Sequence, residues 1–135
     1  MNHASFARLI LEDNPLLSMK VQLAANVPIE EVEQLLTEVL RFMNLTQIAA
    51  ERLTPSNIVD LAWHEFILFT RYYADFCETQ FGRFVHHHPG GIESENRICF
   101  KKTHYYYQKT YDEIPNPKYW GKILAEIADA SDCGV

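Results

Sequence analysis

One uninterrupted stretch of sequence constrains the fold more than any other feature. From Ser56 to Phe81 the chain contains neither glycine nor proline, and Thr54-Pro55 before it is typical of a helix start, with a capping hydroxyl and a proline in the first turn. We therefore predict a long helix from about residue 55 to residue 80. At about 100° per residue, one arc of this helix is apolar and is expected to face the core: Ile58, Ala62, Phe66, Phe69, Tyr73 and Phe76. Other large apolar side chains lie outside the arc, so we expect this helix to be central and covered on more than one side.

Helical spacing of apolar residues recurs along the rest of the chain. It predicts a short helix over residues 3–13, which Asn14-Pro15 ends, a helix over 28–44 and a helix over about 93–112. Ile123, Leu124 and Ile127 suggest a last short helix. No segment alternates as a strand does, and no internal repeat is present. The predicted fold is all-α: residues 1–135 form one single-domain helical bundle of about five helices around a long central helix.

Composition places the chain among globular proteins. It has 135 residues, of which 47% are hydrophobic and 22% charged, so one core can form without disulfides or a metal. The three cysteines, Cys77, Cys99 and Cys133, are an odd number without CxxC spacing, which indicates reduced thiols. The N-terminus lacks the apolar region of a signal peptide, and no stretch is long enough to span a membrane. We therefore expect a cytoplasmic protein without membrane contact.

Charge argues against nucleic acid as a partner. The net charge is −6, which disfavours unspecific attraction to phosphates or anionic lipids. The segment from Arg97 to Lys109 does combine basic residues with three tyrosines, as a surface for single strands would. Tyr107, however, falls in helical register with Phe100 and Tyr111 and is expected in the core. The basic residues are then an ordinary solvated face, and nucleic acid binding is not expected.

Aspartate and histidine residues form the candidate functional site. Asp60 and His64 are four residues apart, so their side chains share one face of the predicted helix. The glycine-containing loop 82–92 adds His86, His87 and His88, of which one or two at most would face inward. Imidazole and carboxylate are ligands of zinc and iron, so we predict a divalent metal site made of Asp60, His64 and His87 with an open position for water.

Other interpretations of these residues remain open. Asp60 and His64 could be a structural hydrogen-bonded pair, or the site could act without a metal. Cys77 could form a nucleophilic pair with His86 or His87, although a small buried side chain is the simpler interpretation of this cysteine. Two functions therefore remain open. One is metal binding, and the other is a non-catalytic module, including an inhibitor or immunity type of protein, that binds a protein partner.

Several short motifs occur in a fixed order along the chain. They are Thr54-Pro55-Ser56, Val59-Asp60 followed by Trp63-His64, Phe76-Cys77, and His86-His87-His88-Pro89, with Arg41-Phe42 before them and Tyr107, Thr110, Tyr111 and Pro117 to Trp120 after them. In these motifs the chain resembles the bacterial single-domain type of the glycine-rich domain-containing protein-like family, over residues 30–120. The resemblance implies a domain without an agreed activity, substrate or cofactor. The chain departs from that family in carrying Phe66 where a second histidine is common, and in lacking the glycine-rich tail.

Overall fold

The regular structure is helical throughout the part of the chain that can be described. The computed structural model describes residues 2–88 and 90–121, and within these ranges it contains no strand. The helices are α1 (His3–Asp13), α2 (Pro15–Ala25), a 3-10 turn η1 (Ile29–Glu31), α3 (Val32–Ile48), α4 (Asn57–Ile67), α5 (Thr70–Phe81), α6 (Glu93–Tyr111) and α7 (Pro117–Trp120). The predicted all-α single-domain fold is confirmed. The helix predicted around Ile123, Leu124 and Ile127 lies outside the described residues.

Two helices meet at Asn14. The predicted first helix is confirmed as α1, and the proline after Asn14 then occupies the first position of a second helix, α2. The spacing of apolar residues does not predict α2, because the leucines and the methionine of this helix are distributed around its whole circumference and do not form one apolar face. Leu17 and Val21 are buried, whereas Leu16, Met19 and Leu23 are exposed. Pro15 thus marks both the end of α1 and the start of α2.

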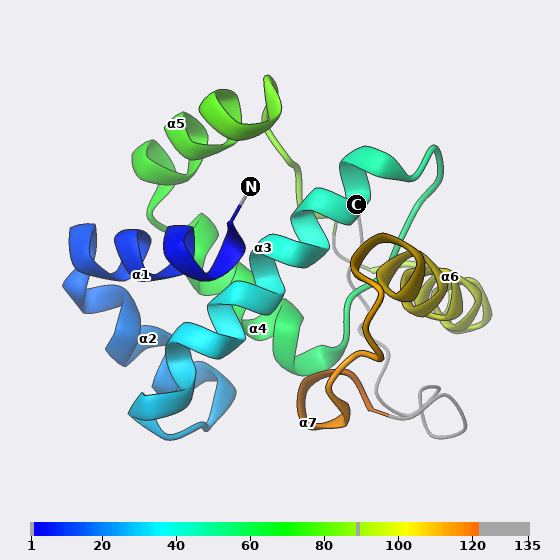
Figure 1. Ribbon diagram of the computed structural model, residues 1–135, viewed down its shortest axis with the longest axis horizontal. Helices are drawn as coiled ribbons and strands as arrows, with labels where there is room; N and C mark the ends of the chain where they lie inside the picture. Colours follow the sequence, from blue (N-terminus) through cyan, green and yellow to red (C-terminus); the bar gives the residue numbers. More distant parts are fainter. Residues whose placement is uncertain (1, 89, 122–135) are drawn as a thin grey trace.

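The central helix of the molecule is α3. It runs through the middle of the fold, with α1 and α2 on one side and α6 and α7 on the other (Figure 1), and it packs against α1, α2, α4 and α6. Seven of its apolar side chains have no exposed surface: Leu35, Leu36, Val39, Leu40, Phe42, Met43 and Leu45. The helix was predicted over 28–44, but it extends to Ile48 and begins after the 3-10 turn. A central helix is therefore present, but it is not the predicted one.

The predicted helix over 55–80 is in fact two helices. α4 ends at Ile67, Phe69 leaves the helical region with φ −84° and ψ 64°, and α5 begins at Thr70. In one straight helix Phe66 and Phe76 would lie about 15 Å apart along the axis. Their ring centroids are only 5.8 Å apart, because the chain changes direction sharply between α4 and α5 (Figure 1). The predicted arc is thus largely buried, but it is split between two helices that pack against each other.

The longest helix of the described residues is α6, in the C-terminal half of the chain. This helix matches the predicted range and ends where Asp112 adopts the left-handed conformation, with φ 52°. Phe100 and Tyr107 are buried as predicted, with 0% and 2% of their surface exposed. No helix in residues 2–88 and 90–121 combines the length and the apolar character needed to cross a membrane.

Truncating the buried face of α3 is expected to destabilise the protein strongly. Leu36→Ala should lower the free energy of unfolding by about 2–5 kcal/mol, because it removes buried methyl groups and leaves a cavity. Leu23→Ala on α2 is the matched control. Leu23 is 72% exposed, so its loss should change the free energy by less than about 0.5 kcal/mol. Urea unfolding followed by circular dichroism measures both, and equal effects would contradict α3 as the core helix.

Candidate functional site

Buried hydrogen bonds fix the start of α4 and therefore the position of Asp60. Ser56 Oγ accepts from the N–H of Val59 at 3.3 Å and donates to the carbonyl of Tyr119 at 2.6 Å. Ser56 is thus the cap, whereas the sequence predicts Thr54. The reason lies in α6: the hydroxyl of Thr103 accepts from the N–H of Thr54 and donates to its carbonyl, which holds Thr54 outside the helix.

Asp60 is paired with a loop histidine. His87 Nε2 lies 2.7 Å from Asp60 Oδ1, and only 9% and 11% of the two side chains are exposed. The indole of Trp63 packs edge-on against the His87 ring, with centroids 4.7 Å apart. A carboxylate can only accept a hydrogen bond, so Nε2 carries the proton and Nδ1 remains available. Among the three consecutive histidines, His87 is the one that faces inward, while His86 and His88 are exposed.

His64 completes the cluster at the surface. It is exposed one turn after Asp60, and its ring centroid lies 5.2 Å from that of His87. The structure thus brings together Asp60, His64 and His87, which belong to α4 and the loop 82–92. The hydrogen bond, however, joins Asp60 to His87. The alternative of a structural pair between Asp60 and His64 finds no such bond within the described residues.

The geometry of this cluster is that of a hydrogen-bonded pair with a nearby imidazole. Two ligand atoms bound to one tetrahedral zinc ion lie about 3.3 Å apart, given bond lengths of about 2.0–2.1 Å. The 2.7 Å between Asp60 and His87 is shorter than that and fits a hydrogen bond. Accordingly, in residues 2–88 and 90–121 no three His, Cys, Asp or Glu side chains are already arranged to hold a metal ion.

Cys77 is a buried side chain next to the same loop. Burial raises the pKa of its thiol, although hydrogen bonds with the backbone of Val85 and the hydroxyl of Tyr73 act in the opposite direction. The indole N–H of Trp63 donates to that hydroxyl at 3.0 Å, and the hydroxyl donates to the carbonyl of Val85 at 2.6 Å. A thiol with a raised pKa is a poor nucleophile at neutral pH. Its hydrogen-bond partners are thus Tyr73 and the backbone of Val85, and no hydrogen bond from this thiol to His86 or His87 occurs in the part of the chain that the structure describes.

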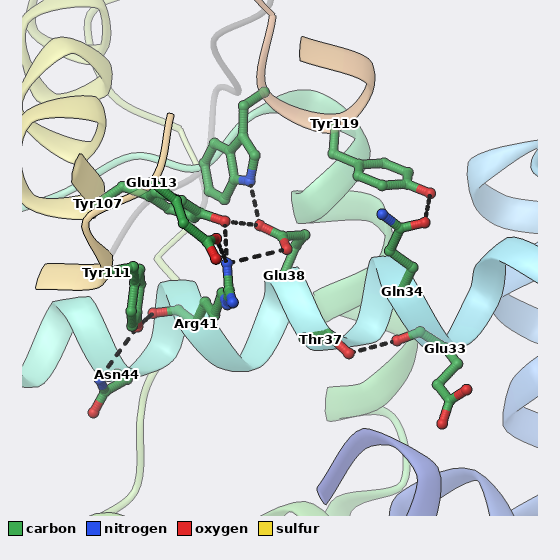
Figure 2. A network of polar contacts seen from close by, with 11 residues as sticks. Glu33, Gln34, Thr37, Glu38, Arg41, Asn44, Tyr107, Tyr111, Glu113 and Tyr119 are labelled. Atoms are coloured by element: carbon green, nitrogen blue, oxygen red, sulfur yellow. Dashed lines mark hydrogen bonds and ion pairs between the residues drawn. The ribbon is translucent and has the colours of Figure 1, made fainter. Parts of the chain in front are cut away.

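A second polar cluster lies on α3 and was not predicted. Glu38 is only 6% exposed, and its Oε1 accepts hydrogen bonds from the hydroxyl of Tyr107 at 2.6 Å and the indole of Trp120 at 2.9 Å. Arg41 Nη1 lies 3.9 Å from the other carboxylate oxygen and donates to Tyr107 and to Glu113. Figure 2 shows Arg41 between the carboxylates of Glu38 and Glu113. This cluster links α3 to α6 and α7.

The sequence does contain a signal for this second cluster. Glu38 follows Leu35 by three residues and precedes Phe42 by four, so it shares their face of the helix. A carboxylate on an apolar face is almost never buried without partners. Helical spacing could therefore have identified Glu38 as a buried acid, but it could not have identified Tyr107 and Trp120 as its donors.

Comparison with known proteins identifies the family. The sequence model of the UCP032817-like family matches residues 13–118. The chain belongs to this family. No curated protein and no solved structure matches the chain.

The UCP032817-like region contains most of both clusters. It includes Asp60, His64 and His87 as well as Glu38 and the α6 tyrosines, and it ends two residues before Trp120. It also begins earlier than the predicted family-like core of residues 30–120, since it includes all of α2. The family description states no activity, substrate or cofactor.

Burial raises the pKa values of the tyrosines around Glu38. For Tyr107 burial is the main cause, followed by its hydrogen bond to Glu38. For Tyr111 burial raises the pKa to about 12, although the hydrogen bond from Asn44 and the charge of Arg41 oppose this change. Tyr119 also has its pKa raised to about 12, by burial and by its hydrogen bond to Glu31.

These shifts predict a loss of stability in alkaline solution. The contribution of these tyrosines is fully present below about pH 10, the pKa of an unfolded tyrosine, and is lost as the pH rises through their higher folded-state values. Tyr107→Phe should lower the free energy of unfolding by about 1–3 kcal/mol at neutral pH, because it removes a donor to Glu38, and should reduce the alkaline loss.

Urea unfolding at several pH values, together with tyrosinate absorbance, measures this alkaline effect. Tyr105→Phe serves as the control, because Tyr105 is 58% exposed. An alkaline loss of stability that is the same in Tyr107→Phe as in the unmodified protein would contradict the assigned role of Tyr107.

Proposed function

We propose that Asp60, His64 and His87 form a binding site for one divalent metal ion, either zinc or iron. The observation that supports this proposal is the path of the loop 82–92. It returns over α4 so that the His87 ring lies 5.2 Å from the His64 ring and 2.7 Å, atom to atom, from Asp60. His87 from the loop and His64 from α4 thus lie next to each other, near the surface.

The Asp60–His87 pair has the arrangement that commonly supports a metal-binding histidine. In such sites a carboxylate accepts a hydrogen bond from one ring nitrogen and orients the other toward the metal. His87 Nδ1 would then be the first ligand, and the exposed His64 would rotate toward the ion as the second. Water would occupy the remaining positions, which leaves the site open to a further ligand. Asp60 could become a ligand itself once its bond to His87 lengthens.

The second candidate is a module that binds a protein partner, in which these residues are structural. It is favoured by the finding that no three potential ligands are pre-arranged in the described residues. In this interpretation the Asp60–His87 bond fastens the loop 82–92 to α4. The small size and net charge of −6 would suit an inhibitor or immunity type of protein with a basic partner.

Metal uptake tests the first proposal. We expect the full chain, purified without a histidine tag and stripped with a chelator, to bind about one Zn²⁺ or Fe²⁺ in calorimetric titration and to gain melting temperature. His64→Ala and His87→Ala should each weaken binding by at least about tenfold, since each removes one ligand. His86→Ala and His88→Ala are matched controls, because both residues are exposed neighbours in the same loop.

Two results would contradict metal binding. One is no uptake of either ion by the unmodified chain, and the other is an equal effect of all four histidine substitutions. His64→Ala is the most informative variant, because this residue is exposed and its truncation is expected to change the free energy of unfolding by less than about 0.5 kcal/mol. A loss of binding in this variant therefore cannot be attributed to unfolding.

The structural interpretation makes a prediction of its own. If Asp60–His87 fastens the loop, His87→Ala should lower the free energy of unfolding by about 1–3 kcal/mol and accelerate amide hydrogen exchange in residues 83–88. His88→Ala should change neither. Hydrogen exchange read out by mass spectrometry measures this difference, and unchanged exchange in His87→Ala would argue against a fastening role.

We also infer a reducing compartment, and hence the cytoplasm, as the place of this protein. Cys77 and Cys99 are free thiols and both are buried. Proteins of oxidising compartments usually pair their cysteines. The kinship with the glycine-rich domain-containing protein-like family is likewise a proposal, and it rests on the motifs around Trp63-His64 and on the three histidines of the loop.

A further inference from the structure

The loop 82–92 has a second side, which faces away from Asp60. Val85 is buried and the side chain of His87 is nearly so, whereas Phe84, His86 and His88 are exposed. This alternation is what an extended segment produces, because successive side chains point in opposite directions. The outward residues line a groove of about 480 Å³ between the loop and the end of α3, and His87 does not contribute to it. The groove is thus separate from the proposed metal site.

Two arginines in this groove carry charge that no carboxylate neutralises. Arg83 Nε donates to the side-chain oxygen of Gln47 at 2.6 Å. Arg52 Nη2 donates to the side-chain oxygen of Asn96 at 3.0 Å and lies 3.4 Å from the carbonyl of Gly90. All of these acceptors are uncharged. Within the described residues neither arginine has an ion pair, in contrast to Arg8, Arg41 and Arg97.

The balance of charge in the groove is positive. Its carboxylate, Glu51, is already paired with Lys102 at 2.6 Å and accepts from the hydroxyl of Tyr106 at 3.0 Å. The C-terminal end of α3 contributes about half a negative charge, which is less than the two full charges of the arginines. Although the chain has a net charge of −6, this groove is therefore a concave site of positive charge. The hydrogen bonds to neutral acceptors also hold both guanidinium groups in position before any ligand arrives.

We propose that this groove binds a small phosphate monoester with a planar organic part. Guanidinium groups bind phosphate through paired, charge-assisted hydrogen bonds, so Arg52 and Arg83 would hold the phosphate. Phe84 and His86 would bind the planar part: their ring centroids are 4.7 Å apart, and Phe84 is 39% exposed. The volume is within the range of small-molecule sites. This proposal does not depend on the proposed metal site.

Binding of defined phosphates to the full chain tests the proposal. The probes are inorganic phosphate and a nucleoside 5′-monophosphate, titrated calorimetrically at constant ionic strength against sodium chloride. We expect both to bind, and the monophosphate to bind more tightly. Arg52→Gln and Arg83→Gln should each weaken both probes by about tenfold, which is the usual effect of losing a charged hydrogen bond. Phe84→Ala should weaken only the monophosphate.

A matched control separates the groove from net charge. Arg71→Gln removes the same charge from an exposed position on α5, outside the groove, and should leave both affinities unchanged. Melting curves of all variants show whether each is folded, and Arg83→Gln keeps the test decisive if Arg52→Gln unfolds. The proposal is overturned if neither probe binds more tightly than chloride, or if Arg71→Gln weakens binding as much as Arg83→Gln. It is also overturned if single-stranded oligonucleotides bind with an affinity that grows with their length, because the ligand would then be a polymer.

Discussion

A buried carboxylate on the central helix is the constraint on which the C-terminal half of this fold depends. Glu38 lies on the core side of α3, where an ionised group without partners would cost several kcal/mol. Tyr107 from α6 and Trp120 from α7 supply the hydrogen bonds that make its burial tolerable, and Arg41 supplies positive charge. Since these donors come from three different elements, satisfying one carboxylate fixes how α6 and α7 sit on α3. The polar cluster thus specifies an arrangement that apolar packing alone would leave less defined.

Local signals predicted the helical class and several boundaries, but they failed where tertiary contacts decide. The helix boundary at Asn14-Pro15 and the start of α6 at Glu93 could be predicted, because they depend on backbone preferences of residues that are close together in sequence. The break at Phe69 has no glycine or proline to mark it. It exists because Phe66 contacts Tyr73 and Phe76 across two helices, and because the Tyr73 hydroxyl reaches the loop at Val85. Contacts between side chains of different helices do not change the spacing of apolar residues along the sequence, so this spacing cannot predict them.

The candidate site shows the same division between what sequence can and cannot predict. Residue type and spacing indicated Asp60, His64 and one loop histidine, and these three lie together in the structure. Spacing also suggested that Asp60 would pair with His64, whereas the loop supplies the actual partner. The positive groove could not be predicted, because Arg52 and Arg83 are far apart in sequence and their neutral acceptors become visible only in the folded chain.

The two tryptophans give this molecule a pair of built-in optical probes. The indole of Trp63 lies against His87, and that of Trp120 lies in the Glu38 cluster, so each cluster has its own fluorophore. The ring of Phe42 lies between them, with centroids 5.5 Å from Trp63 and 6.3 Å from Trp120. Both indoles are fully buried. Replacing one tryptophan by phenylalanine would therefore leave emission from the other cluster alone, so that events at the loop and at the glutamate can be followed in two separate variants.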